Sequence, residues 1–189
     1  MRDSMKMTVP YQIWTAILTH IEAAGISFVF QTVAFWYFIG RNGFKEILGT
    51  IFTIFYFGFM YHIVRKMAIR DYKDYTPLKP SVIKGIMFGV IVALITAVLH
   101  VIWMLLWMHC SSGESLIGMP AIIYNFIFTL WTFPFYGIMG ASQGHITIIG
   151  QILMYGTSVL AAAAGYLSAK YNIDILDKFQ NSIYEKNED

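Results

Sequence analysis

The sequence predicts an all-α, polytopic integral membrane helix bundle with about five transmembrane helices. Of its 189 residues, 57% are hydrophobic and only 13% are charged. Soluble domains carry about 25% charged residues, so too few polar side chains remain here to cover a surface that faces water. In addition, apolar runs long enough to cross a bilayer alternate with short polar segments. We therefore predict a single transmembrane domain.

Five apolar segments are interpreted as membrane spans. The first begins after Pro10, a residue suited to the first turn of a helix. The second is rich in aromatic residues, and the third follows Ser81, whose hydroxyl can cap a helix N-terminus. The predicted spans are residues 13–39, 47–64, 82–108, 121–140 and 146–167, followed by a polar tail at 168–189.

A basic stretch, Arg65–Lys84, separates the second and third predicted spans. It holds six of the thirteen Lys and Arg residues. Cationic residues near span ends favour the cytoplasmic side, so we predict a cell-membrane protein whose N-terminus and loop 65–84 are cytoplasmic. Five spans then place the tail outside, whereas an even number would put eleven of the thirteen cations inside. Because tails determine orientation more weakly than short loops, five spans remain the prediction.

Polar side chains inside the predicted spans are the candidates for a ligand or ion site, because lipid makes them costly. On the first span, His20 and Gln31 share one helical stripe with Ser27. Glu22 lies about 200° around the helix from His20 and faces a different neighbour. The full set of candidates is Glu22, His20, Gln31, His100, Asn125 and Gln151.

Glu22 is the sharpest of these candidates. It lies about 14 Å inside the first apolar run, close to the middle of a bilayer. We expect it to be buried and either protonated or paired, with Gln151 as the partner at similar depth. In the alternative interpretation, the span begins several residues later and Glu22 lies at the inner headgroups.

Two further features concern the third and fourth predicted spans. His100 and Asn125 fall at similar depth, and His100 shares a stripe with Trp103, so the group could line a ligand cavity or simply pack. Pro134 removes a helical hydrogen bond near the middle of the fourth span. Since broken helices at this depth mark sites or hinges in transporters, Pro134 is a predicted hinge.

The sequence predicts no metal site and no cofactor. Its single cysteine, Cys110, excludes an internal disulfide and a cysteine-rich metal site. His20 and His100 lie at different depths, which argues against a haem held between them. Residues 140–144 match the G-x-S-x-G pattern of hydrolases, but a predicted helix precedes them instead of the required strand.

Three functions follow in order of preference. The first is a membrane-embedded component that binds or transports a small molecule or ion. The second is a non-catalytic accessory or assembly subunit of a larger membrane complex. A partner membrane protein or a second copy would then pack on small residues, namely Gly85, Gly89, Ala161 and Gly165. A membrane enzyme ranks third. The lipid bilayer is the predicted environment, and a net charge of +2 gives no reason to expect nucleic acid.

Overall fold

The computed structural model describes residues 8–37, 44–73, 81–111, 118–139 and 146–173. Four helices in these ranges are long and apolar enough to cross a membrane. The predicted all-α bundle is confirmed, and these helices indicate a multi-pass membrane protein. In order, the elements are α2 (Val9–Tyr37), α3 (Phe44–Asp71), α4 (Val82–Ser111), α5 (Gly118–Thr132), the 3₁₀ helix η2 (Phe133–Phe135) and α6 (Ile148–Lys170).

The structure differs from the prediction for the fourth span, residues 121–140. Its helix, α5, has 15 residues and ends at Thr132. A helix of that length rises about 22 Å, less than the roughly 30 Å of hydrocarbon in a bilayer. The chain stops the α-helix there because Pro134 has no backbone N–H and disfavours helical geometry in the residue before it.

The basic stretch is also more helical than predicted. α3 continues through Arg65 to Asp71, and α4 already includes Lys84. The reason is that the buried face of α3 keeps its spacing through the charged residues, with Val64, Met67 and Asp71 all buried. Residues 74–80 of the predicted loop lie outside the described residues.

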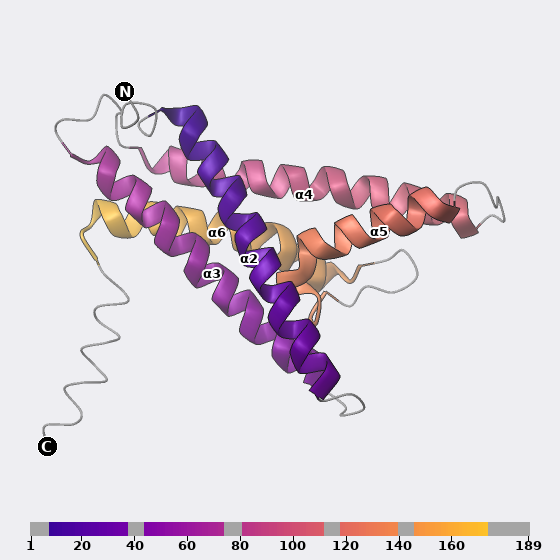
Figure 1. The fold of residues 1–189 in the computed structure, drawn as a ribbon. Coiled ribbons are helices and arrows are strands. Elements are labelled where there is room, and N and C mark those ends of the chain that lie inside the picture. Colours follow the sequence, from indigo (N-terminus) through magenta and orange to yellow (C-terminus); the bar gives the residue numbers. More distant parts are fainter. Residues whose placement is uncertain (1–7, 38–43, 74–80, 112–117, 140–145, 174–189) are drawn as a thin grey trace, which may run out of the picture.

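α6 packs along both α3 and α4, whereas α2 packs on α3 and α4, and α5 packs on α4 and α2. Figure 1 shows α2 and α3 running side by side on one flank and α4 on the other, with α6 behind them. α5 starts beside the end of α4 and returns toward the centre of the bundle (Figure 1). α5 therefore lies between the two flanks.

Small residues let these helices approach closely, and they do so within the chain. A Cβ atom on Gly85 would lie 2.6 Å from Tyr166 Cβ, and one on Gly89 would lie 2.5 Å from Val159 Cα. Gly165 meets the α3 backbone in the same way, and Ala161 is fully buried. The faces predicted to bind a partner are thus already occupied by α3, α4 and α6.

The apolar core consists of two clusters. The first lies toward the Asp71 end of the bundle and joins α2, α3, α4 and α6; it includes Met60, Val64, Phe88 and Tyr166. The second joins the middle of the bundle to α5 and η2, and it includes Tyr56, Trp103, Phe128, Phe135 and Met154. This second cluster contains more aromatic side chains than the first, and it supports the short helix.

Candidate functional site

Asp71 ties the ends of four helices together. Its Oδ1 accepts a hydrogen bond from Gln12 Nε2 at 2.6 Å. Its Oδ2 accepts from Lys84 Nζ at 3.0 Å and from the Tyr166 hydroxyl. The Asp71 side chain is 1% exposed, so these donors replace water around a buried carboxylate.

The hydrogen bonds to Asp71 also show which ends of the four helices lie together. Gln12 is near the start of α2, Lys84 is in the first turn of α4, and Tyr166 is in the last turns of α6. The start of α2, the end of α3, the start of α4 and the end of α6 therefore lie at one end of the bundle. That arrangement differs from the five-span expectation, in which α6 would end on the opposite side.

α5 reaches only halfway along α4. The Trp103 indole donates to Asn125 Oδ1 at 2.8 Å, at the middle of α5. At the end of α5, Trp131 Nε1 donates to Thr96 Oγ1 at 2.8 Å. Thr96 is in the middle of α4, so α5 ends at mid-height in the bundle.

After Trp131 the chain turns back toward the end from which α5 came. The Thr53 hydroxyl shares its proton between the Gly49 carbonyl oxygen, at 2.8 Å, and the Pro134 carbonyl oxygen, at 3.1 Å. Three residues later, Gly137 lies against Lys45 and Gly49, near the start of α3. α5 and η2 thus form a hairpin that enters the bundle and leaves on the same side.

A helix that ends inside an apolar bundle leaves carbonyl groups without helical partners, and these need donors. His20 Nε2 lies 3.0 Å from the Trp131 carbonyl oxygen, and His20 Nδ1 lies 2.9 Å from the Tyr56 hydroxyl. Because a carbonyl oxygen only accepts, Nε2 is the donor to Trp131. In the neutral ring, Nδ1 then accepts from Tyr56.

Gln31 donates to a second carbonyl of this turn, that of Phe133, which also accepts from the Tyr136 N–H at 3.1 Å. Gln31 Nε2 donates to the Phe133 carbonyl at 3.0 Å, and both groups are buried. The structure therefore brings together three residues that the sequence singled out, His20, Gln31 and Pro134, around the end of α5. Ser27, which shares their stripe, is buried and has no hydrogen-bond partner among the described residues.

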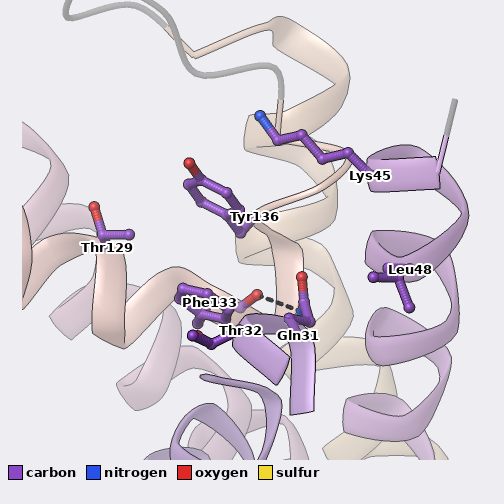
Figure 2. Close-up of a pocket in the computed structure, with 7 residues that line it drawn as sticks. All are labelled: Gln31, Thr32, Lys45, Leu48, Thr129, Phe133 and Tyr136. Carbon is purple, nitrogen blue, oxygen red and sulfur yellow. Dashed lines mark hydrogen bonds between the residues drawn. The ribbon is translucent and has the colours of Figure 1, made fainter. Parts of the chain in front are cut away.

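A pocket of about 310 Å³ opens beside this helix end. Figure 2 shows Phe133 and Tyr136 on one side of it and Leu48 on the other, with the Gln31 side-chain oxygen pointing away from the Phe133 bond. Lys45 Nζ lies 4.6 Å from the centre of the Tyr136 ring. The lining combines apolar walls with polar groups; it consists of Gln31, Thr32, Lys45, Leu48, Thr129, Phe133 and Tyr136.

His100 and Asn125 belong to an aromatic cluster and do not line this pocket. His100 Nδ1 lies 2.5 Å from the Tyr155 hydroxyl, and its ring stacks on Phe128 with centroids 5.9 Å apart. Asn125 is joined to the cluster through Trp103. Their polar atoms are used in holding α4, α5 and α6 together.

The expected pairing of Glu22 with Gln151 is not seen among the described residues. Glu22 is exposed on the side of α2 that faces away from the bundle. Gln151 Nε2 instead donates to the Ile146 carbonyl at 3.1 Å, next to its own helix start. The buried face of α2 is set by Gln12, Ala16, His20 and Ala23, and Glu22 falls outside that face.

Within the described ranges, no three His, Cys, Asp or Glu side chains are grouped to hold a metal ion. Residues 140–144, with the G-x-S-x-G pattern, are not among those ranges. No protein-family model, curated protein or solved structure matches the chain. The site is therefore interpreted from its own geometry.

Proposed function

We propose that this protein binds a small amphipathic molecule inside the membrane, in the pocket beside the end of α5. The observation that supports the proposal is a pocket of about 310 Å³ at the point where a helix is broken halfway through the bundle. That volume falls at the lower end of the range for small-molecule sites. Broken helices at mid-membrane are also where transporters build their binding sites.

The lining favours a ligand with an apolar body and an anionic head. Leu48 and Phe133 supply apolar walls. The Lys45 ammonium lies over the Tyr136 ring and can attract an anionic group at the pocket rim. Gln31 already uses its Nε2 on the Phe133 carbonyl, which leaves its oxygen to accept from a ligand hydroxyl.

The same site offers a route to transport. α5 is held at its end by side-chain hydrogen bonds from His20, Gln31 and Thr53, not by a continued helix. Pro134 is the proposed hinge, because a shift of α5 there would change the width of the pocket. We propose that the pocket faces the outer half of a cell membrane, with the Asp71 end of the bundle in the cytoplasm.

Binding can be tested with octanoate and octan-1-ol, which share a chain and differ in charge. Native mass spectrometry of the protein released from detergent micelles would count the bound molecules. We expect octanoate to bind about tenfold more tightly than octanol, because the carboxylate meets Lys45. Lys45→Gln should remove that difference.

A matched control is Lys170→Gln, since Lys170 also lies over a tyrosine ring, at 5.4 Å from Tyr171, but outside the pocket. This change should leave octanoate binding as it is. Leu48→Trp should fill the pocket and abolish the binding of both probes. Binding that survives Leu48→Trp, or no binding of either probe, would contradict the proposal.

A further inference from the structure

Glu22 is a carboxylate on an apolar outer surface. It is near the middle of the 29-residue helix α2 and is exposed. Its exposed neighbours on the same face are apolar, namely Leu18, Ile21, Ile26 and Val29. No hydrogen bond or ion pair joins Glu22 to any residue within the described ranges of the chain.

Such a position is costly in a bilayer. A charged side chain at the centre of a spanning helix opposes insertion, because lipid cannot solvate the charge. The aliphatic stem of glutamate is too short to carry its carboxylate from mid-depth to the headgroups. A group that covers Glu22 with a hydrogen-bond donor or a positive charge would offset this cost.

Gly25 is a second, independent feature of the same face. It is three residues from Glu22 and so lies beside it on the helix surface. A Cβ atom at Gly25 would meet nothing within 4 Å. In contrast, Gly85, Gly89 and Gly165 each contact another helix closely enough to exclude a Cβ. Packing within the described part of the chain therefore gives no reason for a glycine at position 25, as also at Gly58 and Gly156, whereas a glycine permits close approach of an additional helix.

We infer that the Glu22 face of α2 docks a transmembrane helix of another membrane protein that carries a Lys or Arg side chain at mid-depth. A second copy of this chain would not supply that charge. In the described helices, all Lys and Arg residues fall within the first or last seven positions; these are Lys45, Arg65, Lys66, Arg70, Lys84 and Lys170. A two-fold pairing through α2 would place Glu22 against Glu22.

The test uses the full chain in phosphatidylcholine vesicles, with a donor dye on its single cysteine, Cys110. The probes are acceptor-labelled, leucine-rich transmembrane peptides that carry either Lys or Leu at the centre. Energy transfer should report association of the Lys peptide about tenfold tighter than that of the Leu peptide. Glu22→Leu should remove this preference, and Gly25→Leu should weaken association by crowding the contact.

The matched control is Glu46→Leu, because Glu46 is also exposed but lies in the first turn of α3. It should leave the preference for the Lys peptide intact. Equal association of both peptides, or an equal effect of Glu46→Leu, would overturn the inference. Energy transfer between labelled copies without peptide, lost in Glu22→Leu, would also overturn it in favour of a second copy.

Discussion

At the scale of single residues, Asp71 forms a buried ion pair with Lys84 at one end of the bundle. Its carboxylate accepts from Gln12, Lys84 and Tyr166, and it is almost completely buried. Breaking a buried ion pair by removing one partner usually costs about 3–5 kcal/mol, since the other charge is left uncompensated. We therefore expect Asp71→Ala to lower the free energy of unfolding by about that amount, measured by thermal or detergent-induced unfolding in micelles.

The control for this prediction is Lys66→Ala, an exposed charge on the same helix. Its effect should stay within about 0.5 kcal/mol. The double variant Asp71→Ala/Lys84→Ala should lose less stability than the two single variants together, because the partners are coupled. An additive result, or an Asp71→Ala protein as stable as the Lys66 variant, would show that the ion pair contributes nothing.

Only some of the polar residues that are buried in the bundle could be predicted from the sequence. Because a polar side chain is unfavourable in lipid, the sequence correctly indicated that His20 and Gln31 are buried. The same argument also indicated Glu22, which is exposed. Asp71 is not among the residues that the sequence indicates, because it follows several Lys and Arg residues in a stretch that is interpreted as a loop. A single signal would have found it: the apolar spacing of α3 at Met60, Val64 and Met67 leads to position 71 on the same face.

At the scale of the elements, the contact between α3 and the segment after η2 depends on glycine. A Cβ atom on Gly49 would lie 2.6 Å from Gly137 Cα, so the two backbones touch. Gly49→Ala should separate them and lower the free energy of unfolding by about 1–3 kcal/mol. Chemical or thermal unfolding in micelles measures this loss, and reduced octanoate binding would accompany it, since Lys45 and Leu48 adjoin the contact.

Gly58 is the matched control on the same helix, since a Cβ atom there meets nothing within 4 Å. Gly58→Ala should keep or raise stability, by up to about 1 kcal/mol, through its higher helix propensity. Equal losses in both variants would mean that helix flexibility, and not close packing, explains Gly49.

The existence of the helices could be predicted from apolar runs, but the path of α5 could not. Residues 121–140 are as apolar as a span, and hydropathy does not record that the chain reverses at mid-height. Pro134 indicated the break. The reversal itself depends on donors from other helices, His20, Gln31 and Thr53, which satisfy the carbonyls of the turn. Such contacts between distant residues are not visible in a local pattern.

At the scale of the whole molecule, we expect an even number of crossings, because the described residues contain four long apolar helices and one hairpin. The Asp71 contact joins the starts of α2 and α4 to the ends of α3 and α6. We expect the end of α6 to lie on the cytoplasmic side with them, because that side would then hold most of the Lys and Arg residues. Hydropathy favours five spans and the charge count favours an even number, and the described residues contain four helices long enough to cross a membrane.

The side of each segment can be measured by cysteine labelling in a Cys110→Ser background. Lys73 and Asn172 are exposed near the ends of α3 and α6, and Glu46 and Met119 are exposed near the starts of α3 and α5. With intact cells, a membrane-impermeant maleimide should label cysteines at Glu46 and Met119. Cysteines at Lys73 and Asn172 should react only after the membrane is opened. If the cysteine at position 172 reacts in intact cells while that at position 73 does not, α5 crosses the membrane completely and the hairpin interpretation is wrong.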